Sequence, residues 1–296
     1  MKGSTVGVPV DPNPKFADFA RPERLVSAQW LSAQLGTKGL RVVESDEDSL
    51  LYDIGHIPTA MRIDWHKDLC DPVTREFISA EAFAELMSEK GIAPDDTVVI
   101  YGDKSNWWAA YTFWVFKLYG HQDVRLLDGG RDAWMAEERD TSYDVPQYPA
   151  TNYPVPVADS DVRIFVDEIT ADTPAQLVDV RALEEYTGQV ETGQLKVRRA
   201  GHIPGAVNLP WNTTVLANSY FKNRAELNQL FSMLYAGKST AVYCQQGDRS
   251  AHTWFVLKYL LGFTDVRNYD GSWAEWGNMV RMPVAAGDQP GKLNIV

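Results

Sequence analysis

The sequence predicts an α/β protein made of two tandem domains, each with a mainly parallel central sheet flanked by helices. Three observations predict it. The chain has 296 residues, enough for two domains that each bury a core. The second half repeats long stretches of the first, and in both halves short β-branched runs alternate with helical stretches. Such alternation is typical of parallel sheets covered by helices on both faces.

The repeat has the size of a whole domain. GHIPTAMRIDW at 55–65 returns as GHIPGAVNLPW at 201–211, an offset of 146 residues. The stretch 98–134 lines up with 240–276 at an offset of 142, with matching Tyr, Gly, Asp-Gly and Trp positions. Solenoid repeats are only about 20 to 50 residues long, so each copy is expected to fold as a domain with its own core.

The predicted elements follow the same order in both copies. The first has strand-like runs RVVES, TVVIY and DVRLL and helical stretches EAFAELMSEKG and WWAAYTFWVFKLYG; the second has QLVDV, TAVYC and DVRNY with AELNQLFSML and AHTWFVLKYLLG. Between them, DVPQYPATNYPVPVADSD contains four prolines and is predicted to be an extended linker. The predicted boundaries are 20–143 for the first domain, 144–161 for the linker and 162–285 for the second domain.

Composition narrows the function. A formal net charge of −12 argues against nucleic acid or an anionic membrane surface as a partner. No apolar segment is long enough to span a bilayer, and the first 20 residues lack the apolar core of a signal peptide, so a cytoplasmic location is expected. Two cysteines cannot form a disulfide framework, and no paired His or Cys spacing suggests a metal. We expect neither a metal nor a cofactor.

One loop stands out chemically. CQQGDRS, residues 244–250, follows a β-branched run and precedes a long apolar helix that should be buried. The carboxyl ends of parallel strands are where α/β folds bind ligands, and a helix N-terminus beside a glycine turn favours anions. Cys244 is therefore expected to have a lowered pKa, assisted by Arg249 and opposed by Asp248 unless that carboxylate points to solvent.

Most lone cysteines are small buried hydrophobic residues. Cys70, in DLCDPV, has no adjoining strand-to-helix turn and no glycine, and it is predicted to be structural. At Cys244 the strand, loop, glycine, arginine and helix coincide, which predicts a nucleophile.

Loop length separates two chemistries. Phosphatases that form a phosphocysteine place five residues between the cysteine and the arginine, whereas four separate Cys244 from Arg249. The smaller ring disfavours a phosphatase or arsenate reductase and suits the outer sulfur of a persulfide.

Several motifs together resemble a known family. Cys-x-x-Gly-x-Arg-Ser before an apolar helix, with DGSWAEW, LVDVRALEEY and GHIPGAVNLPW, resembles the rhodanese domain. The duplication resembles the two-domain thiosulfate and 3-mercaptopyruvate sulfurtransferases, over about residues 25–283. The resemblance implies a ping-pong transfer of sulfane sulfur through a persulfide on Cys244. It also implies a substrate cradle formed by Gln245, Gln246, Gly247, Asp248, Arg249 and Ser250.

The resemblance also implies partners. These are a small-molecule sulfur donor, thiosulfate first, and a thiophilic acceptor such as cyanide or a thiol, with thioredoxin or another sulfur-carrier protein as further candidates. Three alternatives stay open: a 3-mercaptopyruvate sulfurtransferase, a module that relays persulfide sulfur from a partner protein, and a protein that only binds.

The first copy is expected to be non-catalytic, since Gly102 stands where the thiol should be and Trp107 where the arginine should be. The histidine of GHIP recurs in the catalytic and the non-catalytic copy, as His202 and His56, and is therefore predicted to be structural in both, as are Asp179 and Arg181. The many tryptophans are expected in the core and in interdomain packing.

The sequence also departs from the family pattern. Gln245 and Gln246 are neutral where thiosulfate enzymes typically carry Arg and Lys, and Glu185 stands where an arginine is expected. Arg198 and Arg199, just before GHIP, are the candidates for the missing anion contact.

Overall fold

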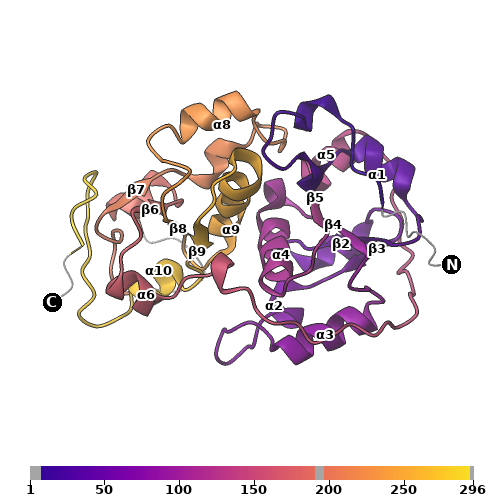
Figure 1. The fold of residues 1–296 in the computed structure, drawn as a ribbon, viewed down its shortest axis with the longest axis horizontal. Coiled ribbons are helices and arrows are strands. Elements are labelled where there is room, and N and C mark those ends of the chain that lie inside the picture. The colour runs from indigo at the N-terminus through magenta and orange to yellow at the C-terminus, as the bar shows by residue number, and fades with distance from the viewer. Residues whose placement is uncertain (1–7, 191–196, 294–296) are drawn as a thin grey trace. The chain divides into compact units, whose positions relative to one another are not determined.

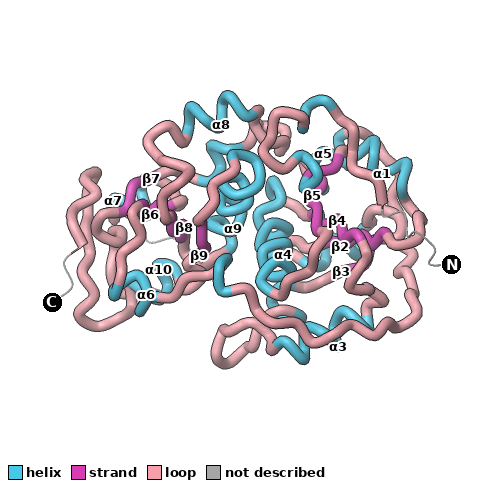
Figure 2. Tube along the Cα trace, viewed as in Figure 1, coloured by secondary structure: helices cyan, strands magenta, loops and turns pink. Residues whose placement is uncertain are grey.

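A computed structural model describes residues 8–190 and 197–293. By its contacts the chain divides into two compact units: unit 1 runs to Asp159 and includes Ala217–Phe221, and unit 2 comprises Ser160–Leu216 and the chain from Lys222 onward. Figure 2 shows short strands connected by helices and long loops. The domain boundaries drawn from the sequence stay a prediction.

Unit 1 contains a five-stranded sheet in the order β1-β5-β4-β2-β3, with every pair parallel. Its strands are β1 (Leu25–Val26), β2 (Leu40–Glu44), β3 (Ala60–Arg62), β4 (Thr97–Tyr101) and β5 (Val124–Leu127). Its α-helices are α1 (Ala28–Gln34), α2 (Trp65–Asp68), α3 (Ala80–Glu89), α4 (Trp107–Leu118) and α5 (Gly130–Ala136). All residues of β4 are buried, because helices cover the sheet on both faces (Figure 1).

Unit 2 repeats this plan with a four-stranded parallel sheet in the order β7-β6-β8-β9. Its strands are β6 (Gln176–Asp179), β7 (Ala206–Asn208), β8 (Thr240–Tyr243) and β9 (Val266–Asn268), and its α-helices are α6 (Val166–Ala171), α7 (Leu183–Thr187), α8 (Arg224–Leu230), α9 (Asp248–Phe255) and α10 (Ser272–Trp276). A parallel bridge from Arg163 to Asn268 occupies the place that β1 has in unit 1. The predicted tandem α/β fold is confirmed.

Each unit has its own hydrophobic core. In unit 1 it gathers around Trp30, Tyr101 and Trp134, and in unit 2 around Tyr243, Trp273 and Trp276. The helix after Cys244 begins as α9 and continues as a π-helical stretch, Val256–Leu261, in which only Lys258 is not buried. The prediction of a buried helix behind the CQQGDRS loop is therefore confirmed.

The proline-rich segment has no helix or strand up to Asp159, as expected, but it packs closely on unit 1. The hydroxyl of Thr151 donates to the carbonyl of Ile92 at 2.6 Å, and Tyr153 is buried with its hydroxyl 2.8 Å from Nδ1 of His121. Such contacts hold against unit 1 a segment that composition alone describes as an extended linker.

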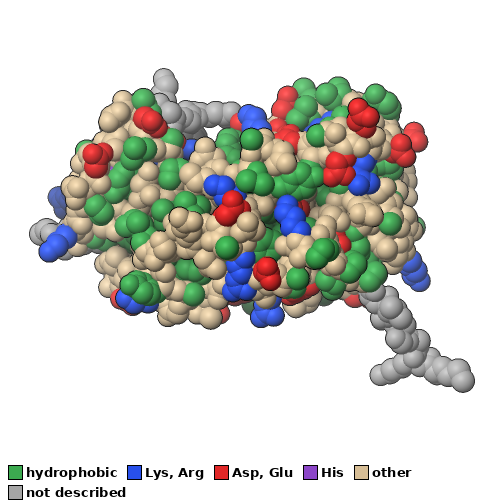
Figure 3. Space-filling view, turned by 90° about the horizontal axis from the view of Figure 1, so that it is seen from above, with side chains coloured by type: hydrophobic (Ala, Val, Ile, Leu, Met, Phe, Trp, Pro, Cys, Tyr) green, Lys and Arg blue, Asp and Glu red, His purple; other side chains and the backbone are tan. Residues whose placement is uncertain are grey.

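Surface charge is mixed. On the face drawn in Figure 3, acidic and basic side chains lie interspersed among hydrophobic and other residues. Among the described residues, no helix combines the length and apolar character needed to cross a bilayer.

Candidate active site

Cys244 lies directly after β8, at the carboxyl end of the strand that pairs with β6 and β9. Its side chain is completely buried. Four residues later, at Asp248, the chain enters α9, which packs along β8 and β9 (Figure 1). The local order of strand, loop and helix therefore places the thiol at the ligand-binding edge of a parallel sheet.

Gly247 makes the turn into α9. Its φ is +97°, and a Cβ atom there would lie 2.8 Å from the Cα of Asp270. Any other residue would be strained in conformation and would also collide with backbone. The carbonyl of Gly247 accepts a hydrogen bond from the buried side chain of Asn268 at 3.0 Å. This glycine lets the loop close tightly enough to bring its amides toward the sulfur.

The start of α10 holds the loop from the other side. The hydroxyl of Ser272 accepts the amide of Cys244 at 3.1 Å, and the amides of Trp273 and Ala274 donate to the carbonyls of Cys244 and Gln245 at 3.1 and 2.9 Å. Beyond the packing role predicted for the tryptophans, no role in the site was predicted for these residues. The sequence signal for them is the DGSWAEW motif, which also carries the family resemblance.

Three groups of the described chain lie within hydrogen-bonding distance of the sulfur of Cys244. The amide of Gly247 donates to Sγ at 3.1 Å, the hydroxyl of Ser250 lies 3.5 Å away, and Oδ1 of Asp248 lies 3.3 Å away. The amide and the hydroxyl can stabilise negative charge on the sulfur. The carboxylate can accept the thiol proton.

The expectation of a lowered thiol pKa is wrong for this structure. Burial, and then the neighbouring Asp248 carboxylate, raise the pKa of Cys244, outweighing Arg249, Ser250 and the amide of Gln246, which lower it. Asp248 is only 4 % exposed and points at the sulfur instead of at solvent. Burial raises the pKa of the Asp248 carboxyl as well.

Arg249 is paired with Glu185 of α7. Its Nη1 lies 2.8 Å from Oε2 of Glu185 and its Nη2 lies 3.2 Å from Oε1, a bidentate ion pair in which both side chains are largely buried. Burial acts to lower the pKa of Arg249, but the hydrogen bonds of Glu185 and nearby negative charge raise it overall. Glu185, which stands where the family pattern predicts an arginine, therefore neutralises the charge of Arg249.

The other predicted site residues are placed differently. Gln245 is buried and Gln246 half-buried. Arg198 is exposed, and its amide donates to Oδ1 of Asn278. Arg199 donates from all three guanidinium nitrogens to four carbonyls, those of Trp276, Gly277, Met279 and Met282. These contacts make Arg199 a brace for the chain after α10 and not the expected anion contact.

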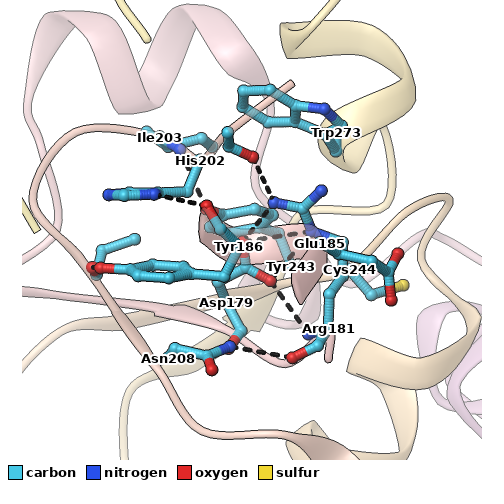
Figure 4. A network of polar contacts seen from close by, with 12 residues as sticks. Asp179, Arg181, Glu185, Tyr186, His202, Ile203, Asn208, Tyr243, Cys244 and Trp273 are labelled. Carbon is cyan, nitrogen blue, oxygen red and sulfur yellow. Dashed lines mark hydrogen bonds and ion pairs between the residues drawn. The ribbon is translucent and has the colours of Figure 1, made fainter. Parts of the chain in front are cut away.

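Asp179, the last residue of β6, and Arg181 form a buried ion pair (Figure 4). Nη2 of Arg181 lies 2.5 Å from Oδ2 of Asp179 and donates to the carbonyl of Gly201 at 2.7 Å. The guanidinium also lies over the ring of Trp273, 4.8 Å from its centroid. Every one of these contacts is internal, which supports the structural role predicted for the pair.

The two GHIP histidines have matching structural contacts. His202 stacks on Tyr186 with ring centroids 3.6 Å apart, and His56 stacks on Tyr52 at 3.8 Å. In each case Nδ1 is bonded to the carbonyl of the same tyrosine. Cys70 is half-buried and pairs through its backbone with Phe77. These observations support the structural roles predicted for all three residues.

The corresponding loop of unit 1 excludes a thiol on geometric grounds. A Cβ atom on Gly102 would lie 2.2 Å from the carbonyl oxygen of Ser45. The amide of Gly102 instead donates to Oδ1 of Asn106 at 3.0 Å, and the amide nitrogen of that side chain donates to the carbonyl of Leu127. The loop is therefore closed by an asparagine where unit 2 has the thiol and its partners.

In unit 1, the guanidinium that corresponds to that of Arg181 comes from a different element. Arg131 of α5 binds Glu44 at 2.7 Å and the carbonyl of Gly55 at 2.6 Å, as Arg181 binds Asp179 and the carbonyl of Gly201. In the sequence repeat, Arg131 stands where unit 2 has Trp273. Asp46 takes the place of Arg181 and is buried, and this burial, together with Glu44, raises its pKa to about 9.

Comparison with known proteins agrees with this architecture. The model of the rhodanese-like domain matches residues 27–137 and 165–279. A thiosulfate sulfurtransferase of Corynebacterium glutamicum is 64% identical over 96% of this chain and 97% of its own length. The sulfur carrier protein TtuD of Thermus thermophilus is 49% identical over 92% of this chain and 99% of its own.

Among solved structures, the 3-mercaptopyruvate sulfurtransferase SseA of Escherichia coli matches with a TM-score of 0.75 over 84% of this chain and 98% of that one. At 24% identity this likeness shows the fold. The two family-model matches, and the relatives of high identity over nearly the full chain, also show the family. The chain belongs to the rhodanese family and is a two-domain sulfurtransferase.

Proposed function

We propose that Cys244 is the nucleophile, and that the protein moves the outer sulfur of thiosulfate to a thiophilic acceptor through a persulfide on this residue. The observation that carries the proposal is the position of Sγ, buried within hydrogen-bonding distance of the Gly247 amide and the Ser250 hydroxyl. Covalent catalysis of this kind splits one transfer into two easier steps.

In the first step the thiolate of Cys244 attacks the outer sulfur of thiosulfate. A new S–S bond forms to Sγ, the original S–S bond breaks, and its electron pair leaves with sulfite. In the second step cyanide or a thiolate attacks the outer sulfur of the persulfide, and Sγ leaves as the thiolate. No external oxidant or reductant is needed in either step.

The loop supports the same proposal for its other residues. Gln245 to Ser250 would surround the outer sulfur, with the Gly247 amide and Ser250 hydroxyl stabilising the charge on the sulfurs. Arg198 is exposed and is retained as the candidate anion contact. Both cysteines are free, which suits a reducing compartment, so the proposal includes a cytoplasmic location.

A second function has specific support. The ion pair between Arg249 and Glu185 leaves the loop with less net positive charge than a dianionic donor favours, and one relative is named a sulfur carrier protein. We therefore keep a relay as the alternative, in which sulfur arrives from a partner protein such as a cysteine desulfurase and leaves to thioredoxin or another sulfur carrier. 3-Mercaptopyruvate is the second small-molecule donor to test.

Intact-mass spectrometry after incubation with thiosulfate tests the proposal. Wild-type protein and the Cys70→Ser variant should each gain one sulfur, which cyanide removes, and Cys244→Ser should gain none. Loading from 3-mercaptopyruvate alone would replace thiosulfate as the donor. Loading only from a cysteine desulfurase would favour the relay, and sulfur on Cys244→Ser would overturn the assignment of the nucleophile.

A further inference from the structure

The sulfur of Cys244 has one proton acceptor among its hydrogen-bonding partners in the described structure. The amide of Gly247 only donates, and the hydroxyl of Ser250 does not take up a proton near neutral pH. The carboxylate of Asp248 lies 3.3 Å from Sγ and can accept the thiol proton directly. Cys244 is completely buried, so a proton acceptor inside the loop is needed if the thiolate is to form there.

Asp248 is oriented toward the sulfur by the turn before it. Gly247 at φ +97° starts α9 immediately after the loop, and Asp248 is the first residue of that helix. Its side chain therefore turns back over the loop, where it is 4 % exposed. A carboxylate serving only as a solvated helix-capping charge would lie on the outer side of this turn.

The neighbouring charges are paired. Arg249 of α9 binds Glu185 of α7, and Asp270, against which Gly247 packs, binds Arg163 with two contacts of 2.8 Å. The Cys244 and Asp248 side chains are thus two acids in contact within a buried site. Two buried negative charges 3.3 Å apart are strongly unfavourable, so a state in which the pair holds one proton between them is favoured over one in which both groups are ionised.

We propose that Asp248 is a further catalytic residue, which takes the thiol proton of Cys244 as the sulfur attacks the donor and keeps it while the persulfide exists. This inference rests on the proposed function, because it presupposes sulfur loading on Cys244. In this step the S–H bond of Cys244 breaks and an O–H bond forms on Asp248. The electron pair left on Sγ forms the new S–S bond to the outer sulfur of thiosulfate, and sulfite leaves with the electron pair of the bond that breaks. The neutral acid then stands beside the persulfide, and the second step returns the proton to Sγ.

A purely electrostatic role of Asp248 predicts the opposite change in the rate of sulfur loading. If Asp248 only adds negative charge, replacing it with asparagine lowers the pKa of the thiol, and sulfur loading becomes faster at neutral pH. If Asp248 accepts the proton, the same substitution makes loading slower. Asp248→Asn keeps the size of the side chain and removes the ability to accept a proton.

The experiment measures the rate of single-turnover loading of Cys244 by thiosulfate from about pH 5 to 9, in a Cys70→Ser background that leaves one thiol. We expect Asp248→Asn to load about 100-fold more slowly than the parent at pH 7, the low end of typical proton-transfer contributions. The deficit should shrink as the pH rises and hydroxide removes the thiol proton. Asp265→Asn, which removes one exposed charge from unit 2, should load at the parental rate.

Loading by Asp248→Asn at the parental rate or faster at pH 7 overturns the inference and leaves the proposed function intact. Absence of loading in the parent itself overturns the proposed function instead. A second measurement needs no variant at position 248. Infrared difference spectra of the parent before and after loading should show a newly protonated carboxyl group, and their failure to do so also contradicts the inference.

Discussion

Replacing Glu185 with glutamine should separate stability from activity. Glutamine has nearly the same shape and keeps one oxygen that can accept an N–H of Arg249, but it removes the negative charge. The wild-type pair joins the guanidinium and the carboxylate at 2.8 and 3.2 Å, with side-chain exposures of 15% and 4%. The substitution therefore leaves a mostly buried arginine without its counter-charge.

The expected loss of stability follows from that geometry. At about 3 Å and an effective dielectric constant of about 20, the attraction within the pair is about 5 kcal/mol, partly offset by the desolvation of both ions. Removing one partner of a buried pair costs about 3 to 5 kcal/mol. Because Arg249 keeps some exposure, we expect the free energy of unfolding to fall by about 3 kcal/mol, measured by urea unfolding.

Activity should change in the opposite direction. With Glu185 neutral, the charge of Arg249 becomes available to the thiolate and to an anionic donor. A hydrogen bond to a charged group is worth about 1.5 kcal/mol or more, so kcat/KM for thiosulfate should rise about tenfold. The KM should also become more sensitive to salt. Initial rates of thiocyanate formation from thiosulfate and cyanide measure both effects.

Glu184→Gln is the matched control, since Glu184 is the adjacent residue of α7 and is exposed. It should change neither stability by more than about 0.5 kcal/mol nor kcat/KM appreciably. If Glu185→Gln remains folded and its kcat/KM for thiosulfate is unchanged or lower, Glu185 orients Arg249 instead of masking its charge, and the reasoning is refuted.

Three further predictions concern the loop and unit 1. Gln246→Lys should lower the KM for thiosulfate several-fold, because it adds a positive charge to a half-buried loop position; unchanged steady-state kinetics would show that charge there is not limiting. Gly247→Ala should lower the free energy of unfolding, measured in urea, by about 2 to 6 kcal/mol, because of backbone strain and the contact with Asp270. Gly237→Ala, with no atom within 4 Å of the added Cβ, should be nearly neutral, and equal stabilities of the two variants would contradict the role given to the turn. Burial, and then the charge of Asp46, raise the pKa of Asp103 to about 7, so the folded state holds this proton more tightly than the unfolded chain, and the stabilisation is lost as the pH rises from about 4 through about 7. Asp103→Asn should therefore flatten the stability profile by up to about 1.4 kcal/mol per pH unit in that window, and an unchanged slope would exclude Asp103 as its source.

Much of the fold could be predicted because it depends on local pattern. The repeat, the alternation of strand and helix and the buried helix after Cys244 are properties of apolar spacing, and the structure has each of them. The turn at Gly247 could also be predicted, since a glycine between a strand and a helix commonly marks a conformation that other residues rarely adopt.

The limits of prediction lay in contacts between distant elements. Arg131 in unit 1 and Arg181 in unit 2 each donate to the carbonyl of the GHIP glycine, although the two arginines stand at different positions of the repeat. Because the same contact is made from a different element in each unit, it leaves no matching motif in the sequence. Likewise, Arg199 lies near the GHIP motif in sequence, but its guanidinium donates hydrogen bonds to carbonyls about 80 residues further along the chain.

The sequence by itself determined a duplicated α/β sulfurtransferase fold and one loop with a single thiol, because loop length, glycine position and residue type are local. Only the tertiary structure decided the electrostatics of that thiol. Whether Asp248 faces solvent or Sγ depends on how α9 leaves the turn, and whether Arg249 is available depends on Glu185, 64 residues away. Burial and the angles at which separate elements meet set these contacts, and neither is encoded in spacing along the chain.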